Sequence, residues 1–206
     1  MKNLIPSVAI VLLVACESET KKNSSTTAKN ETKQEIAKSS NSSADYSSLF
    51  YNYTCDVSCT DLAKILQIPA SDISAQTSES PNECFFKIKG FGEGHDDTGT
   101  ALRLMSVPSS KGQSKKDIAN LLKDKAELPS GILKGRDITL ADAGDCNIII
   151  QPRRGTVRIL NENYDNFFVI TYQTKVSVLG RNEEQHEALT KKVKNLANYL
   201  VTTYKK

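Results

Sequence analysis

Hydrophobic residues recur every three to four positions in three segments, the spacing of one face of an α-helix. A short helix is predicted after Thr60, its expected N-cap, and it ends before Pro69. A second helix is predicted from Ser114 to the residues before Pro129. The third occupies the C-terminal segment, with glutamates in its first turns and lysines at its end, as the helix dipole favours. Its apolar face consists of Leu189, Val193, Leu196, Ala197, Leu200 and Tyr204.

Alternation of apolar and polar residues predicts strands between these helices. Residues 84–89 and 101–105, joined by a glycine-rich loop, are expected to form a hairpin. Four more strands are predicted around residues 132–138, 147–151, 156–160 and 166–176. Short connections between consecutive strands favour antiparallel pairing. The sequence therefore predicts an α+β fold: an antiparallel sheet of about six strands with helices packed on one face, and a long amphipathic C-terminal helix.

The N-terminal region has a different composition. Residues 17–45 contain one large aliphatic residue, Ile36, among serine, threonine, lysine, glutamate and asparagine. Burial of apolar surface cannot offset the entropy of ordering such a segment, so we expect a disordered tether. Its root-mean-square reach is about 30 Å. Residues 46–206 are predicted to form a single α+β domain, which is long enough to bury one core.

Four aromatic residues stand where the tether meets this domain: Tyr46, Phe50, Tyr51 and Tyr53. We interpret them as the residues that dock the end of the tether onto the core. The alternative is a platform for a peptide or a glycan.

The first residues have the layout of a secretion signal. A basic start precedes an apolar run from Leu4 to Val14, which is about half of the roughly 20 residues that a membrane-spanning helix needs. The run ends in Leu13-Val14-Ala15-Cys16, which resembles the bacterial lipobox. The resemblance implies a lipoprotein signal peptide over residues 1–15, with cleavage before Cys16 and a diacylglycerol on its thiol. Residues 16–45 would then be the lipidated cysteine and the tether.

A lipid on Cys16 predicts a location in the bacterial cell envelope. Two or three acyl chains, at about 0.8 kcal/mol per buried methylene, anchor a protein stably to a membrane. The next residue is Glu17, whereas the inner-membrane retention signal of enteric lipoproteins has aspartate there. An outer-membrane or cell-surface location is therefore favoured over the inner membrane.

Composition and charge exclude several classes of protein. The chain has 206 residues, 27 basic and 24 acidic, and a formal net charge of +3. This composition fits neither a fibrous protein, nor a disulfide-packed miniprotein, nor a polytopic membrane protein. The charge is small and evenly mixed, so no nucleic-acid partner is expected. No cofactor is predicted, because the phosphate-binding and dinucleotide-binding glycine motifs do not occur.

Beyond Cys16, the cysteines form an even set of four in a domain that is expected to be exported: Cys55, Cys59, Cys84 and Cys146. Oxidation is permitted outside the cytoplasm, so two disulfides are expected. Cys84 shares the register of Phe86 and Ile88, and Cys146 that of Ile148 and Ile150. Both should face the covered side of the sheet. We favour a pairing of each strand cysteine with Cys55 or Cys59, although all three connectivities are open.

One loop combines carboxylates with an imidazole. Glu93, His95 and Asp97 alternate within residues 92–99 and are candidate metal ligands. Alternate side chains of an extended chain lie about 7 Å apart, so they converge on one ion only if the loop bends. A solvated turn is the favoured interpretation, and no metal site is predicted. Sequence also places His186 at the helix surface, and Arg153 and Arg154 in a solvated turn.

The domain as a whole resembles the PsbP-like α/β fold, which small bacterial lipoproteins of uncharacterised role also use. The resemblance covers about residues 55–204. It rests on the order of the elements, a cysteine before the first helix, Cys84 at the start of the first strand, and the turn at Gly144-Asp145. Cys146 stands where such proteins have alanine. The family offers no catalytic residue to carry over.

No catalytic set emerges from these patterns. The leading hypothesis is a lipid-anchored, non-enzymatic envelope module for binding or assembly, with the membrane and an unidentified envelope protein or component as its partners. One alternative is an envelope enzyme, a metal-assisted hydrolase that uses residues 93–97. Another is a lipoprotein that inhibits an envelope enzyme.

Overall fold

The computed structural model describes residues 44–94, 99–128 and 135–206. Its centre is a seven-stranded antiparallel sheet in the order β1-β2-β3-β7-β6-β5-β4. The fold is therefore α+β, as predicted. The strands are β1 (Ile73–Gln76), β2 (Glu83–Ile88), β3 (Thr100–Val107), β4 (Asp137–Leu140), β5 (Asn147–Gln151), β6 (Thr156–Leu160) and β7 (Phe167–Thr171).

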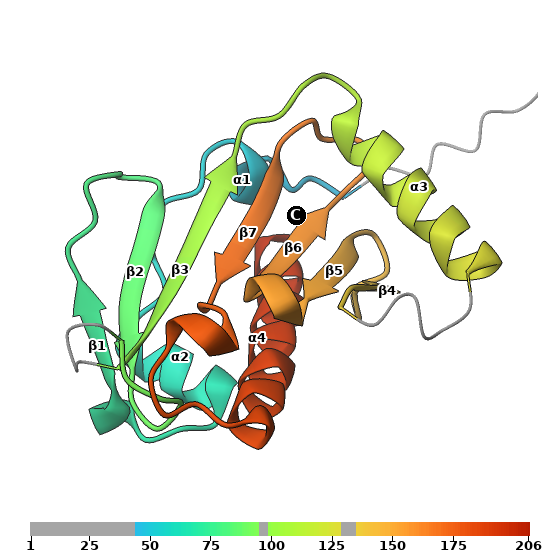
Figure 1. The fold of residues 1–206 in the computed structure, drawn as a ribbon. Coiled ribbons are helices and arrows are strands. Elements are labelled where there is room, and N and C mark those ends of the chain that lie inside the picture. The colour runs from blue at the N-terminus through green and yellow to red at the C-terminus, as the bar shows by residue number, and fades with distance from the viewer. Residues whose placement is uncertain (1–43, 95–98, 129–134) are drawn as a thin grey trace, which may run out of the picture. The chain divides into compact units, whose positions relative to one another are not determined.

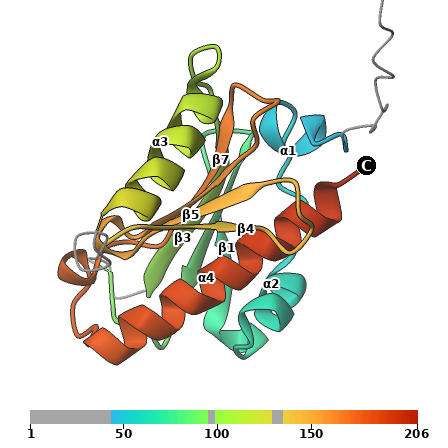
Figure 2. The same cartoon turned by 90° about the vertical axis from the view of Figure 1, so that its right-hand side faces the viewer.

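Helices cover both faces of the sheet, so the prediction of one covered face was wrong. α1 (Ser47–Phe50), α2 (Cys59–Leu66) and α4 (Glu183–Tyr204) lie on one face, and α3 (Gln113–Glu127) crosses the other (Figures 1 and 2). The main core lies beneath α4. Within the described ranges, no helix has the length and apolar character needed to cross a bilayer.

The run Ile148-Ile149-Ile150 explains the second covered face. Successive strand residues point to opposite faces, and all three isoleucines are buried. Ile148 and Ile150 join the main core, whereas Ile149 packs in a smaller cluster with Ile118 of α3. An unbroken apolar run is typical of a strand buried on both faces, so this feature was readable in the sequence.

The structure adds β1, an edge strand that pairs with β2 through Ile73 and Ile88. Its four residues, Ile-Ser-Ala-Gln, contain a single large apolar side chain, that of Ile73, which is too weak a pattern to predict a strand. Residues 132–134 of the strand predicted over residues 132–138 lie outside the described residues, and the observed strand β4 begins later, at Asp137. Two helix starts also differ, because Ser58 and not Thr60 caps α2, and Gly112 precedes α3.

The two ends of the described domain lie side by side. Asp45 and Lys206 exchange backbone hydrogen bonds of 3.0 and 3.1 Å. Asp145, in the predicted turn, accepts a hydrogen bond from the Tyr46 hydroxyl. The same carboxylate forms an ion pair with Lys205 at 2.7 Å. The Lys205 contact holds the pKa of this carboxyl below its usual value. We call this region the terminal end.

Three of the four aromatic residues near the terminal end belong to the core. Tyr46, Phe50 and Tyr53 are fully buried, while Tyr51 is partly exposed. Tyr53 packs edge to face against Phe168 of β7, with the ring centres 4.7 Å apart. These contacts fix the first residues of the domain against the sheet.

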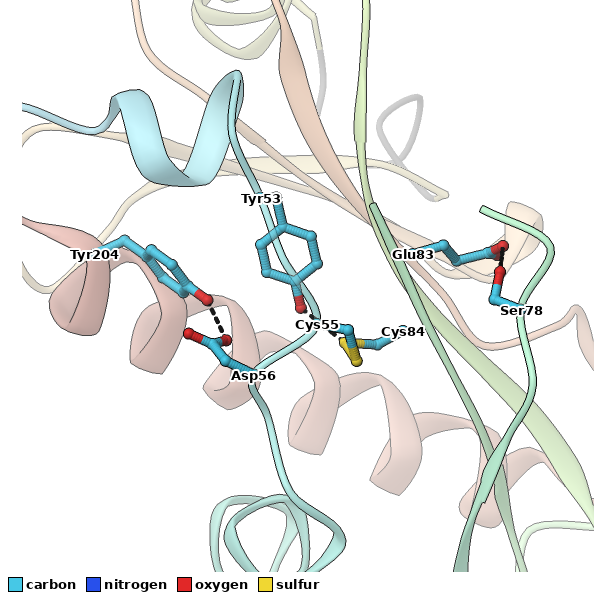
Figure 3. Close-up of a disulfide and its surroundings, with 7 residues drawn as sticks. All are labelled: Tyr53, Cys55, Asp56, Ser78, Glu83, Cys84 and Tyr204. Carbon is cyan, nitrogen blue, oxygen red and sulfur yellow. Dashed lines mark hydrogen bonds between the residues drawn. A yellow bond between two sulfur atoms is a disulfide. The ribbon is translucent and has the colours of Figure 1, made fainter. Parts of the chain in front are cut away.

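One disulfide forms, between Cys55 and Cys84, with the Cα atoms 5.1 Å apart (Figure 3). It joins the segment before α2 to β2, and the Tyr53 hydroxyl lies 3.0 Å from the Cys84 sulfur. The expected second disulfide is absent, since Cys59 and Cys146 are free. Cys84 and Cys146 do face the same core, as predicted.

Distance across the sheet explains why Cys146 stays unpaired. Cys146 immediately precedes β5, which is four strands from β2 in the sheet. At about 4.8 Å per strand this separation is roughly 19 Å, whereas bridged Cα atoms lie within about 7 Å. Cys59 begins α2, which packs at the β1 side of the sheet, so its thiol is far from Cys146.

These positions predict two free thiols in a chain that carries Cys16→Ser. Denaturation without reductant should expose both Cys59 and Cys146 to a thiol reagent. In the native protein only the partly exposed Cys59 should react, because Cys146 is inaccessible and burial raises the pKa of its thiol to about 11. A count of zero after denaturation would show that a second disulfide exists after all.

Candidate functional site

Three connections meet at the end of the sheet opposite the terminal end. They are the β2–β3 loop (residues 89–99, described except for 95–98), the β5–β6 turn at η2 (Pro152–Arg154), and the β7–α4 connection (residues 172–182), which includes η3 (Lys175–Ser177). Glu93 and Leu179 exchange backbone hydrogen bonds of 2.9 Å, which join the first connection to the third. The Tyr172 amide donates to the Gly155 carbonyl at 2.8 Å, which joins the third to the second. We call this region the loop end.

Arg181 ties the loop end together from inside. The residue is 95% buried, and its guanidinium donates to the carbonyls of Phe91 at 2.6 Å and Gln173 at 3.0 Å. It also donates to the hydroxyl of Thr100 at 2.6 Å. No carboxylate pairs with it in the described part of the chain. Burial lowers its pKa from the usual arginine value. A buried charge needs such partners, so Arg181 fixes the positions of the segments that supply them.

His186, in the first turn of α4, is 95% buried, so its predicted surface position was wrong. Its Nε2 donates to the Pro152 carbonyl at 2.9 Å, since a carbonyl can only accept. Its Nδ1 lies 3.4 Å from Arg181 and accepts from that cation. Both ring nitrogens therefore have partners, and the imidazole connects α4 to the β5–β6 turn.

Close backbone packing at the loop end requires glycine. Gly155 has φ +59°, and a Cβ there would lie 2.3 Å from the backbone of Gln173. Gln173 itself adopts a left-handed conformation, with φ 60°, and its side-chain oxygen accepts from the Ala101 amide at 2.7 Å. A strained non-glycine residue held by neighbouring contacts is frequent at functional sites.

The outer surface of the loop end is apolar at two positions and basic at two others. Val176 is 94% exposed and Leu179 is 69% exposed, the highest values among the large hydrophobic residues of the described ranges. Arg153 and Arg154 are exposed and make no hydrogen bond or ion pair within those ranges. Exposed apolar side chains beside unpaired cations are typical of contact surfaces.

A groove runs from this surface along the first three turns of α4. Two adjoining cavities of about 470 and 310 Å³ share Pro152, Glu183 and His186. We call them together the α4 groove. Its further lining residues are Ile150, Arg153, Thr174, Lys175, Val176, Glu187, Thr190, Lys191 and Lys194.

The candidate metal ligands are only partly described. Glu93 takes part in the loop end through its backbone, whereas His95 and Asp97 lie outside the described residues. Among the residues that the structure describes, no group of three or more histidine, cysteine, aspartate or glutamate side chains could hold a metal ion.

The sequence singled out residues 92–99, the Arg153-Arg154 turn and His186 separately, and the structure brings the described part of that loop together with the turn and His186. Sequence reasoning missed Arg181, Val176, Leu179 and the lysines of the α4 groove. An arginine between Gly180 and the helix cap Asn182 carries no sequence signature of burial. The β7–α4 connection has three aliphatic residues, of which Val178 is buried while Val176 and Leu179 are exposed, so the sequence alone did not distinguish the exposed pair.

Comparison of the chain with protein-family models, curated proteins and solved structures yields no match. Function is therefore inferred from the geometry of the chain itself.

Replacement of Arg181 by methionine should lower the free energy of unfolding by about 3 kcal/mol, because buried acceptors at Phe91, Thr100 and Gln173 lose their donor. The matched control, Arg154→Met, should stay within about 0.5 kcal/mol, since Arg154 is exposed and makes no hydrogen bond or ion pair with another described residue. Urea unfolding measures both variants. Equal stabilities of the two variants would contradict the structural role of Arg181.

Proposed function

We propose that the chain is a lipid-anchored, non-enzymatic module of the bacterial cell envelope, and that its loop end binds an envelope protein or component. The anchor is the lipid expected on Cys16, and residues 16–45 are the tether that joins it to the domain. The outer membrane or the cell surface is the favoured location.

The observation that carries this proposal is the placement of the loop end. The tether enters the domain at the terminal end, where Asp45 pairs with Lys206. α4 runs from the loop end to the terminal end (Figure 2), and its 22 residues span about 33 Å. An anchored domain can therefore hold Val176, Leu179 and the unpaired arginines well away from the lipid surface.

The hydrolase alternative uses residues 93–97, and of its candidate ligands Glu93 alone lies in the described ranges. His186 uses both ring nitrogens in structural contacts, so it has no free position for general base catalysis. The inhibitor alternative uses the same surface as the binding module. It differs only in its partner, which would be an enzyme whose activity falls on contact with the loop end.

Site-specific photocrosslinking in cells of the native source tests the proposal. A crosslinker at Val176 should give an adduct of defined mass, while one at Lys123, exposed on α3, should not. Cys16→Ser should release the chain from the membrane fraction and remove the adduct, because the module then leaves the site of its partner.

Two results would count against this function. One is mass spectrometry of the membrane-extracted chain that shows an unmodified Cys16 or a retained signal sequence. The other is the same set of products from positions 176 and 123. If the captured partner is an enzyme, inhibition by the purified chain would identify the inhibitor alternative.

A further inference from the structure

The α4 groove has an elongated shape with an apolar floor. The floor contains Ile150, Pro152 and the ring of His186, which packs against the ring of Tyr172 at 5.8 Å between centres. The helix side is lined from Glu183 to Lys194 at intervals of three to four residues. This face is about 17 Å long, which matches roughly five residues of an extended peptide.

The charges of the groove are unequal. Four cations line it, Arg153, Lys175, Lys191 and Lys194, against the two carboxylates Glu183 and Glu187. Lys175 pairs with Glu183 at 2.5 Å, and this contact lowers the pKa of the Glu183 carboxyl. The other three cations have no ion-pair partner in the described part of the chain. Arg181 adds a further buried cation behind His186.

We propose that the α4 groove binds an extended acidic peptide segment of the envelope partner. This inference rests on the proposed function, and it names the kind of ligand that the loop end would bind. Side chains of an extended peptide alternate between two sides. Apolar residues at every second position would contact the floor, and the acidic residues between them would meet Arg153 at one end and the two lysines at the other.

A fluorescein-labelled hexapeptide of alternating glutamate and leucine is the probe, with fluorescence polarisation of the full chain carrying Cys16→Ser as the readout. The matched peptide has glutamine in place of glutamate. The glutamate peptide should bind at least ten-fold more tightly than the glutamine peptide, and added salt should weaken its binding.

Charge reversal locates the site. Arg153→Glu, Lys191→Glu and Lys194→Glu together should weaken the glutamate peptide at least ten-fold. The control reverses Lys115, Lys116 and Lys123, which lie on α3, on the other face of the sheet, and likewise have no ion-pair partner among the described residues. It makes the same change in net charge and should alter the affinity less than two-fold. Glu187→Gln should strengthen binding about two-fold, because it removes a repulsive charge.

Equal losses in the two charge-reversed chains would overturn the inference, as would equal binding of the two peptides. A third result would also overturn it: the groove-reversed chain still binds the peptide but no longer binds phosphatidylglycerol vesicles. That result would identify a lipid surface as the occupant of the groove. The crosslink from Val176 distinguishes a failure of the binding function from a failure of the acidic-peptide inference. If that adduct persists in cells while the groove reversal leaves peptide binding unchanged, the binding function stands and the acidic peptide is excluded.

Discussion

The buried guanidinium of Arg181, which meets no carboxylate within the described ranges, dominates the architecture of the loop end. Transfer of a charge into the protein interior is costly unless hydrogen bonds replace its hydration. Arg181 obtains them from Phe91 in the β2–β3 loop, from Thr100 at the start of β3 and from Gln173 after β7. The β2–β3 and β7–α4 connections, which are far apart in sequence, therefore have to meet around one side chain, and neither can move far without leaving the charge unpaired.

This constraint acts together with the antiparallel sheet. β7 pairs over its whole length with residues 103–107 of β3, and the contacts beyond the two ends of this ladder are separate from each other. Arg181 organises the loop end, while Asp145, Tyr46 and Lys205 hold the terminal end. α4 connects the two ends and covers the core between them (Figure 1). The result is a domain with an attachment end and, at the far end of α4, a preorganised surface.

The elements with strong local periodicity could be predicted from sequence. β5 and β6 have the predicted bounds, and α4 follows its apolar face and its capping box at Asn182 and Gln185. β1 could not be predicted, because an edge strand needs little apolar character. The second disulfide was expected wrongly, since register indicates which face Cys146 occupies but not how many strands separate it from Cys59. The loop end could not be assembled either, because Arg181 acts through contacts between distant segments, which no local pattern records.

Native-state hydrogen exchange of an Arg181→Lys chain tests most directly whether one guanidinium holds the loop end as a unit. Lysine keeps the charge but cannot form the planar set of hydrogen bonds. The amides of Glu93, Leu179 and Tyr172, which bond between the three connections, should lose protection together by about ten-fold or more, whereas those of Asp45 and Lys206 should keep theirs. Wild-type protection of all three loop-end amides, or a loss at Leu179 alone, would contradict the account.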